Sequence, residues 1–214
     1  MTQISIKTRE LRAHLIITSK DPVRYQLQGV NVQGSNNFTY RLASTDGHRL
    51  LVTYPVLEKV DNLDELNIII SHDDIKRIVT GNKNEFVILK IENDRYYLDS
   101  LEIRPIDGTY PDIERVVPSF DTLETQGQPV IQSHFNFKYL ADAGKVSKLL
   151  DNTTVPVMYL NKTQDASAVI GYKNGFMVLM PVSAAKAATE KKRNGLKENL
   201  ELFAARRTSN KKAA

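Results

Sequence analysis

The side chains best suited to acid–base or metal chemistry are spread thinly along this chain. Its four histidines are His14, His48, His72 and His134. They fall in separate segments and lack the short spacing that metal ligands usually show. No glycine-rich phosphate loop, nucleophile elbow or HExxH helix occurs. We therefore expect no catalytic residues, no metal and no cofactor, and an enzyme is the weakest of the alternatives.

Composition and apolar patterning indicate a soluble, cytoplasmic protein. The 214 residues contain no cysteine, which excludes disulfides and thiolate metal sites, and 41% of them are hydrophobic, enough for a core. No apolar run is long enough to span a bilayer, and the start, MTQISIKTRE, is not a signal peptide.

The net charge of +4 is distributed unevenly. Residues 184–214 hold nine of the 29 Lys and Arg and three of the 25 Asp and Glu, a balance of +6. The preceding residues then hold 20 basic and 22 acidic side chains, a balance of −2. The chain therefore has a near-neutral body and a basic tail, which suits either contact with nucleic acid or a solvated extension.

One pattern of expected elements occurs three times along the body. Each pass has an extended segment, an amphipathic helix and three strand-like runs, and the helices start near residues 8, 72 and 135. The extended segments are QISI (3–6), LNIII (66–70) and QPVIQS (128–133), and the helical segments cover 7–19, 71–81 and 134–150. The first strand-like run after the first helix is RYQLQGVNV (24–32). Ser71 is the expected N-cap of the second helix, and Gly81 follows its end. Three dipeptides are typical of hairpin turns: Asp46-Gly47, Asn93-Asp94 and Asn174-Gly175.

We expect an α+β fold made of three β-α-β-β-β units. One unit cannot cover both faces of its own sheet and helix, so two units should pair into a domain. This predicts a complete domain at 1–118, a linker at 119–128, a third, half-domain unit at 129–183, and a basic helical or disordered tail at 184–214. The third unit has no partner within the chain.

Three stretches resemble the bacterial sliding clamp, the beta subunit of DNA polymerase III. They are ASTDGHRLL (43–51), PIDGTYPDIERVVP (105–118) and FMVLMPV (176–182), in the order and spacing of that family. The resemblance implies the DNA-clamp (processivity) fold. Family chains have three two-unit domains, and two chains close a ring around duplex DNA. This chain resembles the middle domain plus the second half of the last one, so it lacks the parts through which family chains pair.

The resemblance also implies a groove that receives a short Gln-Leu-x-Leu-Phe type segment. Branched and thioether side chains suit such a pocket because they adapt to Leu and Phe anchors. By motif, the groove residues are Leu27, Thr45, Gly47, His48, Arg49, Leu50, Pro111, Val116, Val178, Met180, Pro181 and Val182. Taken singly, several of these residues also fit ordinary core or turn positions.

In the same family, basic residues on the helices and nearby loops face DNA phosphates without reading sequence. Such contacts are salt-dependent. The matching residues here are Arg9, Arg12, Lys20, Arg24, Tyr25, Lys76, Arg77, Lys138, Lys145 and Lys148. Solvated helix faces explain these side chains equally well.

The tail contains a segment, NLELF, that is similar to the family's docking peptide. It consists of Asn199, Leu200, Glu201, Leu202 and Phe203, with asparagine in place of the usual glutamine. Its possible binding sites are the groove of the same chain, the groove of a second copy of the chain, or the groove of a host clamp. Alternatively, Leu196, Leu200 and Phe203 form one stripe of an amphipathic helix.

These features support two functional hypotheses. The first is a non-catalytic sliding-clamp-like replication factor of a phage or mobile element, which tethers a polymerase to double-stranded DNA. Counting units allows a tetramer ring or a twofold dimer. The second is a clamp homologue that does not encircle DNA. It would sequester clamp-binding proteins, or dock on a host clamp through NLELF.

Overall fold

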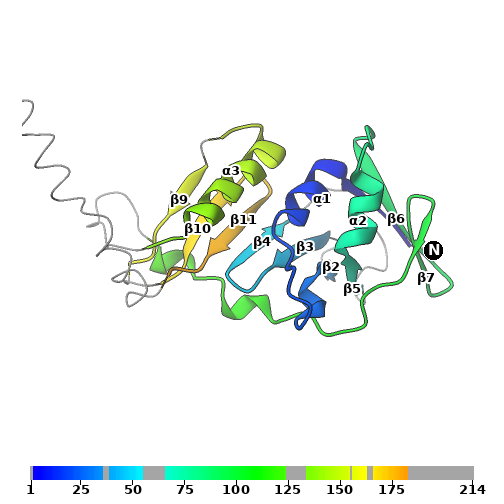
Figure 1. Cartoon of the computed structure of the whole chain (residues 1–214), viewed down its shortest axis with the longest axis horizontal. Coiled ribbons are helices and arrows are strands. Elements are labelled where there is room, and N and C mark those ends of the chain that lie inside the picture. Colours follow the sequence, from blue (N-terminus) through cyan, green and yellow to red (C-terminus); the bar gives the residue numbers. More distant parts are fainter. Residues whose placement is uncertain are drawn as a thin grey trace, which may run out of the picture.

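The computed structural model describes residues 2–35, 39–54, 66–123, 134–154, 156–162 and 166–182. The expected strand QPVIQS at 128–133 and the expected tail, with its NLELF segment, lie outside these residues. Figure 1 shows the elements, with α1 placed between α2 and α3.

The first unit contains one helix and four strands. These are β1 (Thr2–Lys7), α1 (Thr8–Leu15), β2 (Gly29–Ser35), β3 (Thr39–Thr45) and β4 (Arg49–Thr53). The expected helix continues to Ser19, but α1 ends at Leu15 because three β-branched residues follow and the Thr18 hydroxyl donates to the Leu15 carbonyl. A short 3-10 helix, η1 (Tyr25–Leu27), occupies the start of the first expected strand.

The second unit repeats this order. It contains β5 (Asn67–Ser71), α2 (His72–Val79), β6 (Phe86–Glu92), β7 (Arg95–Leu98) and β8 (Leu101–Ile103). The predicted N-cap is confirmed, since the Ser71 hydroxyl accepts from the Asp74 N–H at 3.1 Å. The predicted turn between β6 and β7 is confirmed as well, because Asn93 and Asp94 both have positive φ, as a two-residue hairpin requires.

The third unit contributes α3 (Phe137–Asp151), β9 (Val157–Tyr159), β10 (Ala168–Tyr172) and β11 (Gly175–Leu179). The expected helix starts at His134, but α3 starts three residues later. Asn136 sets this start, because its side chain accepts a hydrogen bond from the Lys138 N–H at 2.9 Å. Two more 3-10 turns, η2 (Ile113–Arg115) and η3 (Phe120–Thr122), lie in the segment before the unit.

The first two units exchange their first strands. The four-stranded sheet has the order β1-β6-β7-β8, so β1 of the first unit pairs with β6 of the second. Conversely, β5 of the second unit pairs with β2 of the first. All of these pairings are antiparallel. The two units therefore complete each other about an approximate twofold axis.

The third unit is joined to the first by a continuous sheet of seven strands, β5-β2-β3-β4-β11-β10-β9. Strand β11 pairs with β4, and Gly175 lies opposite Thr53. A Cβ on Gly175 would come within 2.2 Å of the Val52 carbonyl oxygen. The hairpin itself turns at Lys173-Asn174, because Tyr172 pairs with Gly175. Gly175, expected in the turn, is instead needed for the close approach of β4 and β11.

Buried side chains divide between the two faces of this seven-stranded sheet. On the helix side, Leu51 and Met177 pack with Ile17 of the segment after α1 and with Val146 of α3. On the opposite side, Leu50, Val52 and Val178 pack with Ile113 of η2. A further core lies between the two sheets under α1 and α2. The segment that contains η2 therefore covers the outer face where β4 meets β11.

Candidate peptide-binding groove

A groove of about 260 Å³ opens beside the pairing of β4 and β11. Its lining is mostly apolar, with a few polar groups, which is the usual character of a ligand pocket. The lining residues are Arg24, Gln26, Leu27, Thr45, Gly47, Arg49, Leu50, Pro111, Asp112, Ile113, Val116, Val178 and Met180.

Three segments that are distant in the sequence build this groove. Leu50 lies opposite Val178 in the register of β4 and β11, so both side chains lie on the outer face of the sheet. Leu27 is buried at the end of η1, and Ile113 is buried in η2. Two hydrophobic side chains remain open to an incoming ligand: Val116 is 42% exposed and Met180 is 41% exposed.

Nine of the twelve residues expected in the groove line it. The three that do not are His48, Pro181 and Val182. His48 is exposed, and its ring lies 6.0 Å from that of Tyr139, on the side of α3. The Val182 N–H donates to the His134 carbonyl at 2.7 Å, which directs the chain away from the groove.

Four lining residues were not expected here: Arg24, Gln26, Asp112 and Ile113. Arg24, expected at DNA, extends toward the turn before β4, and a Cβ on Gly47 would lie 2.5 Å from its Nη1. Gly47 also has a φ of +88°, so the turn needs glycine for two reasons. The Asp112–Ile113 pair lies within the segment YPDIERVVP, where the 3-10 turn directs Ile113 inward.

Arg49 has a structural role beside the groove. Its guanidinium donates to Asp142 of α3 at 2.7 Å, to Asp46 at 3.0 Å and to the Ile16 carbonyl at 3.1 Å. It also lies 4.7 Å from the centre of the Tyr139 ring. The side chain is only 6% exposed. Besides lining the groove, Arg49 therefore forms a buried tie between α3, β4 and the end of α1.

The hydrogen bonds to Asp142 favour the ionised form of its carboxyl group. Burial alone would raise its pKa, but hydrogen bonds from Lys145 and Arg49 outweigh that effect and keep the pKa below its ordinary value. Lys145, expected at DNA, donates to Asp142 Oδ1 at 2.7 Å, although its own side chain remains 66% exposed. The third unit is thus joined to the first by charge pairing as well as by strand pairing.

The other residues expected at DNA differ in whether their side chains bond to the protein or are exposed to solvent. Arg12 donates to the Val79 and Asn82 carbonyls at 2.9 and 2.7 Å, so it caps the end of α2. Tyr25 is 51% exposed, and a Cβ on Gly108 would lie 3.3 Å from its ring. The remaining cations are exposed on or beside the three helices, which lie side by side (Figure 1). These are Arg9, Lys20, Lys76, Arg77, Lys138 and Lys148.

Lys20 and Lys76 meet at a second cavity, of about 340 Å³, at the start of α2. His72 also lines it, and His72 Nδ1 lies 2.7 Å from the Thr18 hydroxyl. Burial lowers the pKa of His72. Lys20 therefore joins His72, Asp73 and Lys76 of α2 at one cavity, which sequence patterns did not predict because Lys20 lies in a different segment.

Within the described ranges, no group of three or more His, Asp or Glu side chains is placed to hold a metal ion. None of the helices in those ranges is long and apolar enough to cross a membrane.

The exchanged strands, the helices packed side by side and the groove at the junction of two units define the class of DNA-clamp proteins. Residues 6–112 match the family model of the DNA polymerase III beta subunit, central domain. The chain therefore belongs to the DNA polymerase III beta subunit family. A search of curated proteins gave no match.

Solved sliding clamps share the fold. The Bacillus subtilis clamp superposes with a TM-score of 0.65 at 16% identity, over 85% of this chain and 64% of that one. The Bartonella birtlesii clamp bound to griselimycin superposes with a TM-score of 0.63 at 20% identity, over 86% of this chain and 66% of that one. For the Pseudomonas aeruginosa subunit the TM-score is 0.63 at 19% identity, over 85% of this chain and 66% of that one. This chain thus spans 64–66% of the length of these clamps.

Proposed function

We propose that this chain is a non-catalytic, clamp-like replication factor that binds short apolar peptides of polymerases or other replication proteins. The observation that carries the proposal is the groove beside β4 and β11. Its floor of Leu27, Leu50 and Val178 is apolar, and Val116 and Met180 remain exposed at its mouth. Such a cavity fits two aliphatic or aromatic anchors of a peptide.

Binding of a labelled Gln-Leu-Ser-Leu-Phe peptide to the full chain tests this proposal by fluorescence polarisation. Met180→Ala and Val116→Ala should each weaken binding about tenfold, because each removes apolar contact at a ligand pocket. Val23→Ala is the matched control, since Val23 is 83% exposed and does not line the groove. Equal affinity in all four proteins would place the peptide elsewhere.

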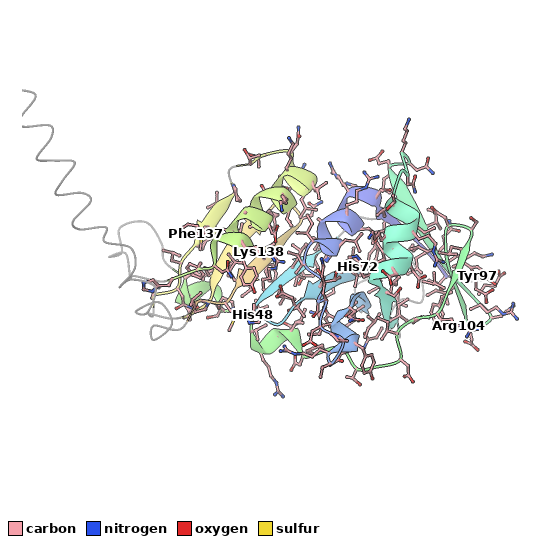
Figure 2. All side chains as sticks on the ribbon, viewed as in Figure 1. His48, His72, Tyr97, Arg104, Phe137 and Lys138 are labelled. Carbon is pink, nitrogen blue, oxygen red and sulfur yellow. The ribbon has the colours of Figure 1, made fainter. Side chains whose placement is uncertain are left out.

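The same chain is proposed to contact double-stranded DNA through the exposed cations of its helix layer. Lys76 and Arg77 are both exposed on α2, and Lys20 lies beside Lys76. Duplex affinity should fall steeply with salt, and K76Q/R77Q should reduce the slope of log affinity against log salt by about two. Arg104→Gln is the control, at the far end of the molecule from α3 (Figure 2).

A second candidate function is that of a clamp homologue that never encircles DNA and uses its tail as a docking peptide. The tail follows directly after the groove, since Met180 lines the groove and the described chain ends at Val182. Sixteen residues, 183–198, separate Val182 from Asn199, a reach of roughly 50 Å when extended. The tail is thus long enough to return to its own groove.

Phe203→Ala separates these alternatives. If the tail occupies its own groove, this change should raise the affinity for the labelled peptide, because a tethered competitor is lost. If NLELF instead docks on a host clamp, the change should abolish capture of that clamp and leave peptide affinity unchanged. A variant that alters neither measurement contradicts the docking role of the tail.

A further inference from the structure

One wall of the groove belongs to an acidic stretch of the chain. Residues 105–123 contain η2 and η3 and pack on the outer face of the seven-stranded sheet through Tyr110, Ile113 and Val117. Figure 1 shows this stretch on the side of the sheet away from the helices. It holds four carboxylates and one cation, a balance of −3. The carboxylates, all on exposed residues, are Asp107, Asp112, Glu114 and Asp121. We call residues 105–123 the acidic segment.

The protein itself neutralises only part of this charge. Glu114 pairs with Arg41 of β3, and Asp112 pairs with Arg115 at 3.1 Å. Both side chains of the second pair are more than half exposed, and exposed pairs are weak. Asp107 forms no ion pair within the described part of the chain. The acidic segment therefore remains attractive to a cationic ligand.

Two of these carboxylates lie at the groove. Asp112 lines it. Asp107 precedes Gly108, and a Cβ on Gly108 would lie 3.4 Å from the Cβ of Gln26, which also lines the groove. The apolar floor therefore has a negatively charged border. A ligand that carries apolar side chains followed by cations is complementary to both parts.

The two arginines that line the groove already have acidic partners. Arg24 pairs with Asp21 at 3.5 Å. Arg49 is only 6% exposed and bonds to Asp142 and Asp46. Neither arginine forms an ion pair with the acidic segment within the described residues.

The sequence after Val182 has the complementary composition. In residues 183–214 the large apolar side chains all fall within eight consecutive residues. They are Leu196, Leu200, Leu202 and Phe203. Every charged residue after Phe203 is basic. These residues are Arg206, Arg207, Lys211 and Lys212. The same stretch starts two residues after Met180, which lines the groove.

We propose that residues 196–212 of the same chain occupy the groove while the protein is free, and that duplex DNA releases them. Leu202 and Phe203 fill the apolar floor, and the cations that follow lie along the acidic segment. We call this arrangement the latch. The inference rests on the proposed function, because it concerns the same groove and the same DNA-binding activity, and it adds a regulation that couples the two.

Tethering makes such a latch effective even when its contacts are weak. A peptide on a flexible tether reaches an effective concentration on the order of 1 mM. A latch with an intrinsic dissociation constant of about 10 µM is then closed in about 99% of molecules. A peptide from outside consequently binds about a hundredfold more weakly than it does to the open groove.

Duplex DNA competes with the acidic segment for the same cations. It carries one negative charge per about 1.7 Å of its axis, a far denser array than four carboxylates of which two are paired. The groove opens on the side of the sheet opposite to the helices, where we propose that the duplex lies. Arg206 follows Phe203 by only three residues, a reach of roughly 10 Å. The tail therefore cannot occupy both sites at once, and DNA opens the groove.

Fluorescence polarisation of the labelled Gln-Leu-Ser-Leu-Phe peptide, with and without a short duplex, tests the latch in the full chain. Saturating duplex should raise the peptide affinity of the wild type at least tenfold. Phe203→Ala should show the higher affinity whether or not duplex is present. R206Q/R207Q should reduce the response to duplex to about threefold or less. R95Q/R104Q removes the same charge from exposed positions of the second unit and should keep the full response.

Thermodynamic linkage gives a second readout, the binding of a labelled duplex. Saturating peptide should raise the duplex affinity of the wild type by the same factor by which duplex raises its peptide affinity. The duplex affinity of Phe203→Ala should not respond to the peptide, because its groove is already open.

Three outcomes would overturn the latch and leave the groove in place. They are equal peptide affinity in wild type and Phe203→Ala, a duplex effect of the same size in both proteins, and a higher affinity in Phe203→Ala with no duplex effect in the wild type. A wild-type affinity that depends on protein concentration would place the tail in the groove of a second copy and would also overturn it. Absence of peptide binding in every protein, with and without duplex, would contradict the proposed function itself.

Discussion

At the scale of single residues, the most informative side chain is Arg49. It is buried, it bonds to Asp142, Asp46 and a backbone carbonyl, and it stacks on Tyr139. The segment ASTDGHRLL led us to expect Arg49 only as a groove residue. Its partners come from α3 and from the end of α1, which no local pattern connects to β4.

We expect Arg49→Met to lower the free energy of unfolding by about 3 kcal/mol, because it leaves two carboxylates without a buried partner. Arg115→Met is the control: Arg115 pairs with Asp112, but its side chain is 84% exposed, so the loss should stay below about 1 kcal/mol. Urea denaturation measures both. Similar losses for the two variants would show that the Arg49 tie contributes little to stability.

His14 gives stability a distinct dependence on pH. It is fully buried between the Ser44 and Thr53 hydroxyls, at 2.8 and 3.0 Å, and burial lowers its pKa to about 3. Between about pH 6.5 and 3 the unfolded chain binds a proton here that the folded chain does not. Stability should therefore fall as pH decreases through this window, by at most about 1.4 kcal/mol per unit.

Denaturation of His14→Gln between pH 7 and 4 checks this expectation. The variant should lose part of the pH dependence, whereas His48→Gln should keep it, because His48 is exposed. An unchanged slope in His14→Gln would assign the acid sensitivity to other groups. The depressed pKa of Asp142 acts in the same direction, but only near and below the ordinary range of an aspartate.

At the scale of elements, the pairing of β4 with β11 decides how the third unit is held. Gly175→Ala should disrupt it, since the added Cβ would lie 2.2 Å from the Val52 carbonyl and 2.9 Å from Thr53 Cα. We expect faster hydrogen exchange at residues 49–53 and a loss of at least about 2 kcal/mol. Gly144→Ala is the matched control, with open space at its Cβ and an expected gain of about 0.5–1 kcal/mol.

Local patterns predicted the helices and several turns well, because caps and apolar spacing act over a few residues. The Ser71 cap and the Asn93-Asp94 turn are examples. Nine expected groove residues do line one groove, since the family motifs carry them. What could not be predicted depends on distant pairing: the role of Gly175, the Arg49 tie, and Arg24 at the groove. Each of these needs the register of β4 against β11 or the position of η1.

At the scale of the whole molecule, the number of units matters more than any single motif. Two units complete each other by exchanging strands, and the third does not receive such an exchange within the described residues. Counting units allows a twofold dimer with six units or a ring of four copies with twelve.

Light scattering on the full chain at rising concentration distinguishes these assemblies. A mass that levels off at two copies would support the twofold dimer, whereas a mass of four copies would support the ring.

The pairing of β4 with β11 has one more consequence. The last strands of the first and third units, β4 and β11, occupy each other's edges within one chain. Among the described residues, the last strand of the second unit, β8, has β7 on one side and no strand on the other. The β4–β11 joint is therefore saturated inside each molecule, and copies cannot add to one another through it.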